Sequence, residues 1–225
     1  MDKKYRHEWK HRLSSSDMIA IRSRMRAIAR PDPHATDGSY LIRSLYFDTP
    51  GDRALRDKLN GVDMREKFRI RFYDLNPDVI HLEKKSKIGG LGTKYSASLD
   101  ETGAMRIVDG DISWMMDSGS SLIQELYCKM YYQQMRPKTI VQYMREPFIY
   151  EPGNVRVTLD YDLKSGLQCT DFLNPEAVMV PAPDAPILME VKWDEYLPEI
   201  IRDAVQLPHC RSESFSKYAS CRMYD

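Results

Sequence analysis

The sequence predicts an α+β fold, an antiparallel β-barrel of about eight strands that forms a tunnel, with helices packed outside. At least five segments alternate apolar residues with charged ones, as strands with two different faces do. Glu-x-Lys recurs on three of them, starting at Glu8, Glu83 and Glu190. Other segments follow the helical period. If the charged faces turn inward, a barrel of about eight strands is wide enough for one chain-like ligand.

Length and composition restrict the function classes. With 225 residues, 42% of them hydrophobic, the chain can bury a large core, and we expect one domain over residues 1–225. Lys and Arg total 33, as do Asp and Glu, which argues against a general nucleic-acid coat because such domains usually carry a basic excess. No apolar run approaches the roughly 20 residues of a membrane helix, and no signal core begins the chain. We therefore expect a cytoplasmic protein whose cysteines are free thiols.

The first quarter of the chain predicts two strands and two helices. Residues 5–13 form a strand with Glu8 and Lys10 on its charged face. Ser and Asp residues at 14–17 cap a helix that ends near Ala29. A strand over 40–47 and a short helix over 51–59 follow. We expect the arginines of the first helix to form a solvated face: Arg22, Arg24, Arg26 and Arg30.

A hairpin over residues 65–87 is the centre of the pattern. Its strands cover 65–72 and 80–87, and the turn covers 75–78. One face holds five cations and one carboxylate: Lys67, Arg69, Arg71, Glu83, Lys85 and Lys87. For a single strand this is most simply a solvated sheet face. Because other strands repeat the pattern, a basic surface for a polyanion is the better interpretation.

The rest of the chain continues the alternation. Lys94 extends a strand after a glycine-rich hairpin end, and residues 101–135 are helical with a Met-rich core stripe. Strands are predicted over 139–150, 154–161 and 187–193, and closing helices over 197–207 and 214–224. Cations on the inner faces would bind phosphoryl oxygens, and the carboxylates would hold a divalent metal through oxygen ligands. The candidate metal ligands are Glu8, Glu83 and Glu190.

At this point the sequence resembles the VTC domain, the catalytic domain of polyphosphate polymerases in the CYTH or triphosphate-tunnel superfamily. The matching segments span nearly the whole chain in family order: Ser44–Thr49, Lys67–Arg71, Glu83–Lys87, Tyr143–Arg145, Val155–Asp160, Glu190–Lys192 and Ser216–Tyr218. The resemblance implies transfer of the ATP γ-phosphoryl group onto a growing inorganic polyphosphate chain, with Mn²⁺ or Mg²⁺ as cofactor.

The resemblance also assigns residues. It implies that eight cations bind phosphates: Lys10, Arg69, Arg71, Lys85, Lys94, Arg145, Arg156 and Lys217. It makes Glu190 the metal ligand. Fixed cations and a metal do most of the work in phosphoryl transfer, so Arg69, Arg71, Lys85, Arg145 and Arg156 are the catalytic candidates. We add four substrate-binding candidates on the same faces: Lys67, Lys87, Tyr143 and Lys192. No catalytic His is expected, because the attacking group is already a phosphate oxyanion.

One departure from the superfamily favours the polymerase. Tunnel triphosphatases typically open with Glu-x-Glu-x-Lys, and the matching residues here are Arg6-His7-Glu8-Trp9-Lys10. An arginine thus replaces the first acid, which removes a metal carboxylate. The alternatives are a tunnel triphosphatase or nucleotide cyclase, or a non-catalytic module that binds polyphosphate. With no phosphate-sensing helical domain or membrane segment in the sequence, we expect a free-standing soluble enzyme that binds no nucleic acid.

Overall fold

The computed structural model describes residues 6–89, 91–207 and 212–223. The chain divides into two compact units, which are described separately. Unit 1 comprises residues 1–41, 143–163 and 184–215, and unit 2 comprises residues 42–142, 164–183 and 216–225. The prediction of one domain over residues 1–225 stays a prediction.

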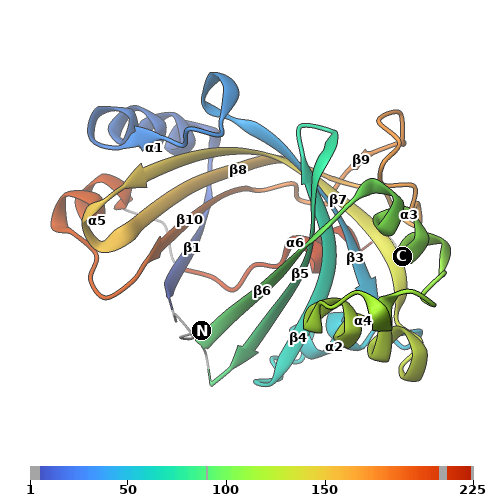
Figure 1. The fold of residues 1–225 in the computed structure, drawn as a ribbon. Helices are drawn as coiled ribbons and strands as arrows, with labels where there is room; N and C mark the ends of the chain where they lie inside the picture. The colour runs from blue at the N-terminus through green and yellow to red at the C-terminus, as the bar shows by residue number, and fades with distance from the viewer. Residues whose placement is uncertain (1–5, 90, 208–211, 224–225) are drawn as a thin grey trace. The chain divides into compact units, whose positions relative to one another are not determined.

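Unit 1 is an antiparallel sheet with two helices on its apolar face (Figure 1). Its strands, in hydrogen-bonding order, are β1 (His7–Leu13), β10 (Ile187–Trp193), β8 (Val155–Ser165) and the second half of β7 (Arg136–Tyr150), to which β2 (Arg30–Pro31) pairs. Its helices are α1 (Ser15–Ile28), α5 (Glu199–Val205) and the 3₁₀ turns η1 (Thr36–Gly38) and η3 (Pro152–Asn154). Helices α1 and α5 lie side by side.

Local chemistry explains where α1 begins and what it covers. Ser14 and Asp17 form a capping box, in which each side chain accepts a hydrogen bond from the other residue's backbone N–H. Ile21 and Met25 are fully buried on its inner face. They share one core with the apolar faces of β8 and β10, for example Val157 and Val191, and with α5. The charged residues of these strands therefore lie on the opposite face of the sheet.

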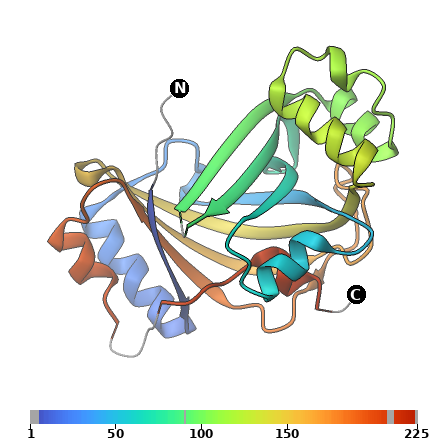
Figure 2. The same ribbon diagram turned by 90° about the horizontal axis from the view of Figure 1, so that it is seen from below.

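Unit 2 contains the remaining antiparallel strands of the same strand order, with helices on their apolar face. Its strands, in order, are the first half of β7, β3 (Tyr40–Asp48), β4 (Arg65–Tyr73), β5 (Asn76–Ile88) and β6 (Leu91–Leu99), while β9 (Val180–Pro181) pairs with the end of β8. Its helices are α2 (Arg53–Leu59), α3 (Glu101–Asp109), the 3₁₀ turn η2 (Met115–Asp117), α4 (Ser121–Tyr132) and α6 (Lys217–Cys221). Figure 2 shows α2 in cyan beside α6 in red, and the two helices are in contact.

The unit 2 core confirms the predicted faces of the hairpin. Phe68, Ile70 and Phe72 are buried and pack with residues of α3 and α4. Most of the Met-rich stripe is core as predicted, with Met115, Met130 and Met135 buried, but Met116 is exposed. Lys67, Arg69 and Arg71 therefore share the other face of β4.

Three predictions about local structure had the wrong boundaries. The hairpin turn is Asp74-Leu75 rather than 75–78, because both residues adopt left-handed φ angles of 51° and 54°, the geometry of a two-residue turn. The last helix covers only Lys217–Cys221, because Ser216 caps it by accepting a hydrogen bond from the backbone of Ala219. The strand predicted over 139–150 begins earlier, at Arg136.

The predicted solvated arginine face of α1 is also wrong in part. Arg22 donates through Nε to the carboxylate of Glu146, at 2.6 Å, and Arg26 donates to the other oxygen at 3.1 Å. Glu146 is buried, and a buried carboxylate needs cationic partners. Arg24 donates to a backbone carbonyl of Ala204 at the end of α5. Arg24, Arg26 and Arg30 are nevertheless exposed, as predicted, although Arg30 lies in β2 rather than in α1.

Candidate functional site

The charged face of unit 1 carries a linked set of acids and bases, called here the Glu190 cluster: Glu8, Lys10, Arg145, Glu190 and Lys192. Strand register places Lys10 directly opposite Glu190, and Glu8 opposite Lys192. Lys10 Nζ lies 3.1 Å from Glu8 and 3.7 Å from Glu190. Lys192 Nζ lies 3.2 Å from Glu8 and 2.8 Å from Glu190. Each lysine thus bridges both carboxylates.

Arg145 is the most deeply held cation of this cluster. Its Nε and one terminal nitrogen each donate to Asp160, both at 2.7 Å, and the terminal nitrogen lies 3.7 Å from Glu190. Burial alone would lower the pKa of Arg145, but Asp160, Tyr143 and Glu190 outweigh it and raise that pKa well above its ordinary value. Arg145 therefore remains a fixed charge at any pH the protein tolerates.

Arg156 lies on the next row of the same face, opposite Lys192. Its guanidinium donates to Asp32, a buried carboxylate, and to the hydroxyl of Tyr40 at 3.0 Å. The sequence analysis missed these partners, because Asp32 lies in a loop and no local pattern connects it to β8. Asp160 was visible as a polar-face residue of its strand, although its ion pair with Arg145 was not.

Unit 2 holds the second set, called here the Glu83 cluster: Tyr46, Arg69, Arg71, Glu83 and Lys94. Arg69 lies opposite Glu83 and donates to it through Nε at 2.7 Å, and Lys94 forms an ion pair with the other carboxylate oxygen. Arg71 lies 4.0 Å from Glu83. Burial alone would raise the pKa of Glu83, but the three cations outweigh it and hold that pKa far below its usual range.

A row of like charges lies beside this cluster. Strand register places Lys67 opposite Lys85, and Lys85 opposite Lys94, on three neighbouring strands. Directly opposed like charges destabilise a sheet. The neighbouring row pairs Arg65 with Lys87. Lys94 of the first row is already paired with Glu83.

Helix α6, which begins with the predicted site residue Lys217, is tied to the Glu83 cluster through two tyrosines. The ring of Tyr218 stacks on the ring of Tyr46 with centroids 5.0 Å apart. Tyr46 in turn accepts a hydrogen bond from Arg69 at 2.8 Å. The Tyr218 hydroxyl donates to Asp48 at 2.8 Å and accepts from Arg222 at 2.7 Å. This network fixes the position from which Lys217 projects.

Tyr218→Phe should lower the free energy of unfolding by about 1–3 kcal/mol, because it leaves buried Asp48 without one donor. Burial and the charge of Asp48 raise the pKa of Tyr218 above its ordinary value of 10.0. The unfolded chain therefore loses this proton first, and wild-type stability falls as the pH rises above 10.0. Urea unfolding at neutral and alkaline pH measures both effects. Equal stabilities of wild type and variant at neutral pH would contradict the assignment.

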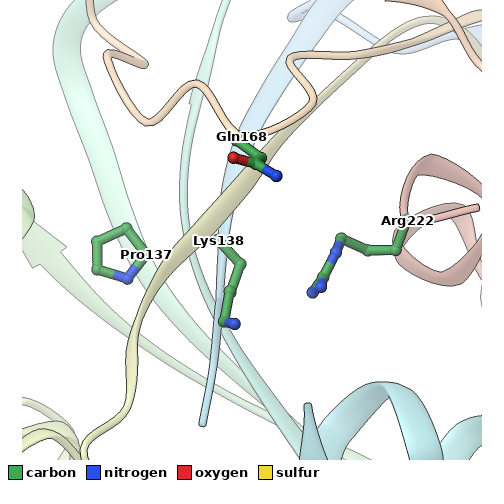
Figure 3. A pocket seen from close by; sticks show the side chains of 4 residues that line it. All are labelled: Pro137, Lys138, Gln168 and Arg222. Atoms are coloured by element: carbon green, nitrogen blue, oxygen red, sulfur yellow. The ribbon is translucent and has the colours of Figure 1, made fainter. Parts of the chain in front are cut away.

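A pocket of about 350 Å³ lies beside α6 and is lined by Pro137, Lys138, Gln168 and Arg222. Figure 3 shows the side chains of Lys138 and Arg222 reaching into the same space. Both cations lie 3.1 Å from the same oxygen of Asp52. Burial would raise the pKa of Asp52, but its hydrogen bonds with these two cations lower it. The cationic charge of this pocket is therefore already partly balanced.

A comparison with protein-family models tests whether the chain is related to the family that its motifs resemble. The model of the VTC domain matches residues 5–224. The chain belongs to the VTC domain family. A search of curated protein sequences finds no match to this VTC domain.

Solved structures confirm the fold class of this VTC domain. A candidate adenylyl cyclase from Hippeastrum, described as having a dominant triphosphatase activity, superposes with a TM-score of 0.60 at 14% identity, covering 96% of this chain and 94% of that one. A candidate adenylate cyclase from Bacillus halodurans gives 0.52 at 14% identity, covering 85% and 82%. The predicted α+β fold of the tunnel type, with antiparallel strands and about eight strands along its main path, is confirmed.

The predicted site residues of the VTC domain fall into two groups. Unit 1 holds Glu8, Lys10, Tyr143, Arg145, Arg156, Glu190 and Lys192. Unit 2 holds Lys67, Arg69, Arg71, Glu83, Lys85, Lys87, Lys94 and Lys217. No helix in the described part of the chain is long and apolar enough to cross a membrane.

The three predicted metal ligands differ in how well they fit a divalent ion. Among the residues the structure describes, no group of three or more His, Cys, Asp or Glu is arranged for a metal. Glu83 has no exposed side-chain surface and is surrounded by cations, so it fits poorly. The ammonium groups of Lys10 and Lys192 each lie near both Glu8 and Glu190, so positive charge is already present between these two carboxylates. Because Mg²⁺ is commonly held by one or two carboxylates plus substrate phosphates, these two residues fit.

Proposed function

We propose that this VTC domain is a polyphosphate polymerase that transfers the γ-phosphoryl group of ATP to a growing inorganic polyphosphate chain and depends on a divalent metal. The row Lys67–Lys85–Lys94 carries the proposal. Neighbouring strands lie about 4.8 Å apart, so this row presents positive charge across three strands. A linear polyanion can contact such a row along its whole length, whereas a single small anion contacts only part of it. We place the reaction in the cytoplasm, with ATP and polyphosphate as partners and no nucleic acid.

The chemistry follows from charge. The transition state of phosphoryl transfer spreads negative charge over the transferred oxygens, and fixed cations stabilise it. Arg69, Arg71, Lys85, Arg145 and Arg156 supply that charge. The remaining cations retain the polymer: Lys10, Lys67, Lys87, Lys94, Lys192 and Lys217, with Tyr143 beside Arg145. Mn²⁺ or Mg²⁺, held by Glu190 and Glu8, would neutralise phosphoryl oxygens of the bound substrate.

Retention of the product favours polymerisation over hydrolysis. A terminal phosphate held in place reacts as if at very high local concentration, so a bound chain competes well with water. The residue at the position where triphosphatases place their first acid also supports the proposal. Arg6 pairs with Asp194 at 2.8 Å, so this position supplies no carboxylate to a metal.

The test uses the purified protein with γ-labelled ATP and Mn²⁺ or Mg²⁺, with and without a short polyphosphate primer. We expect the label in an acid-labile polymer ladder, ADP released in step, and a shorter lag with primer. ADP with an equal amount of orthophosphate and no polymer would instead show a triphosphatase. A cyclic nucleotide would show a cyclase. Bound polyphosphate with unchanged ATP would show a binding module.

Arg71→Ala should weaken tripolyphosphate binding about tenfold or more. Charge-assisted bonds from arginine to phosphate contribute roughly 1.5–3 kcal/mol each, and about 1.4 kcal/mol is a factor of ten. Arg71 is the cleaner variant because its contact with Glu83 is long, at 4.0 Å, while Arg69 holds that carboxylate at 2.7 Å. Isothermal titration calorimetry measures the dissociation constants.

The matched control is Arg106→Ala in the same unit, since Arg106 lies at the surface, where it contacts Asp111, Ser113 and the ring of Trp114. Arg22 is unsuitable as a control because it holds buried Glu146. Equal affinity losses in the Arg71 and Arg106 variants would show that the assigned face of β4 is wrong.

A further inference from the structure

Strand β8 carries two buried polar atoms that have no hydrogen-bond partner within the described part of the chain. They are Nε of Arg156 and the hydroxyl oxygen of Thr158. Thr158 is only 2% exposed, so bulk water does not solvate its hydroxyl. Native proteins satisfy the large majority of such groups, and each exception requires an explanation.

The two atoms lie on one face of one strand. Residues two apart on a strand point the same way, about 6.6 Å apart along the chain. The register places Thr158 opposite Glu190 and Arg156 opposite Lys192. Thr158 therefore sits in the row of the Glu190 cluster that also contains Lys10.

The chemistry of the two atoms identifies what they lack. A guanidinium N–H can only donate, and a hydroxyl can donate one hydrogen bond. Three cations contact Glu190, namely Lys10, Arg145 and Lys192, so this face is rich in donors. The carboxylate of Glu190 is already bound by these three cations. The missing partner is therefore an acceptor with negative charge, and different oxygens of one phosphate chain can accept from the two donors.

We propose that Thr158 is a further substrate-binding residue, whose hydroxyl donates to a phosphoryl oxygen bound beside Glu190, with Nε of Arg156 donating to the same phosphate chain. The proposal rests on the proposed function, because the acceptor is a phosphate of the triphosphate or polyphosphate substrate. In the ligand-free protein the hydroxyl of Thr158 then makes no hydrogen bond that stabilises the fold. Removal of that hydroxyl should therefore affect binding and stability in different directions.

Thr158→Val tests this, because valine keeps the shape and removes the hydroxyl. Tripolyphosphate affinity, measured by calorimetry without metal, should fall about tenfold. The urea midpoint of the ligand-free variant should stay equal to that of the wild type or rise, because an unsatisfied buried group has been removed. Thr158→Ser should restore most of the affinity.

Thr139→Val is the matched control. Thr139 is also buried, but its hydroxyl contacts Ser165 at 3.3 Å and the carbonyl of Ile140 at 3.3 Å. Its valine variant should show the reverse pattern, a lower urea midpoint with unchanged affinity. The contrast separates a hydroxyl used by the ligand from one used by the fold.

The outcomes are distinguishable. If the wild type binds tripolyphosphate and Thr158→Val binds it equally well, the inference is overturned while the proposed function stands. A lower urea midpoint for Thr158→Val with normal affinity overturns it as well, since the hydroxyl then has an internal partner. If the wild type does not bind tripolyphosphate at all, the inference and the proposed function both fail. Weaker binding by Thr158→Val alongside hydrolysis without polymer supports the inference and refutes only the polymerase.

Discussion

Glu190→Gln is expected to reduce metal-dependent phosphoryl transfer by about two to three orders of magnitude while the protein stays folded. The amide keeps the shape of the side chain but loses the charge with which we expect Glu190 to bind the metal. Folding should survive because the neighbouring cations keep other acids: Lys10 and Lys192 retain Glu8, and Arg145 retains Asp160. Turnover at saturating Mn²⁺ and the far-ultraviolet circular dichroism spectrum measure the two effects.

A second measurement on the same variant separates the metal role from a simple ion pair. Without metal, tripolyphosphate should bind Glu190→Gln as tightly as the wild type or more tightly, because three cations lose an internal competitor for the phosphate. Glu176→Gln, at an exposed glutamate, is the control and should change neither property. Normal turnover of Glu190→Gln at saturating Mn²⁺ would remove Glu190 from the metal site.

Glu83→Gln should lower the free energy of unfolding by about 3–5 kcal/mol, because removing one member of a buried ion pair leaves its partners uncompensated. Arg69 and Arg71 are both 5% exposed, and Glu83 is their shared carboxylate. Added tripolyphosphate should recover part of the loss, since a ligand that binds only the folded state stabilises it. Urea unfolding with and without the ligand measures both changes.

The acid side of the pH profile provides an independent check on Glu83. Its pKa is held far below the ordinary value of 4.5, so the unfolded chain binds this proton at a higher pH than the folded one does. The contribution of Glu83 to stability is therefore complete above pH 4.5 and is lost as the pH falls below it. The Glu83→Gln variant should therefore lose less folding stability than the wild type as the pH falls below 4.5, whereas Glu176→Gln should lose as much as the wild type. A Glu83→Gln variant within about 0.5 kcal/mol of wild type would contradict a role as compensating charge.

The strands and their charged faces could be predicted because alternation is a local property. Side chains two apart share a face, so Arg69 and Arg71 were placed together from the sequence alone. A glutamate within a run of lysines indicated that Glu83 shares that face. Helix α1 could be predicted equally well, because its capping residues Ser14 and Asp17 directly precede the apolar residues that recur with the helical period.

The partners of the charged residues could not be predicted in the same way. Arg22 and Glu146 are separated by 124 positions, and Arg156 and Asp32 by the same number. No short-range pattern carries such pairings. The alignment of Lys94 with Lys85 depends on strand register, which the glycine-rich segment between them leaves undetermined. The unsatisfied hydroxyl of Thr158 is visible only once every neighbour is placed.

The polymerase proposal is tested most directly by a ³¹P NMR time course of one reaction with ATP and Mg²⁺, in which ADP, orthophosphate and internal phosphoanhydride phosphates are counted together. We predict that each ADP formed is matched by one phosphate added to the polymer, while orthophosphate stays constant. The Glu190→Gln protein should form neither ADP nor polymer. Orthophosphate that rises one for one with ADP, without any internal phosphate signal, would contradict the polymerase proposal.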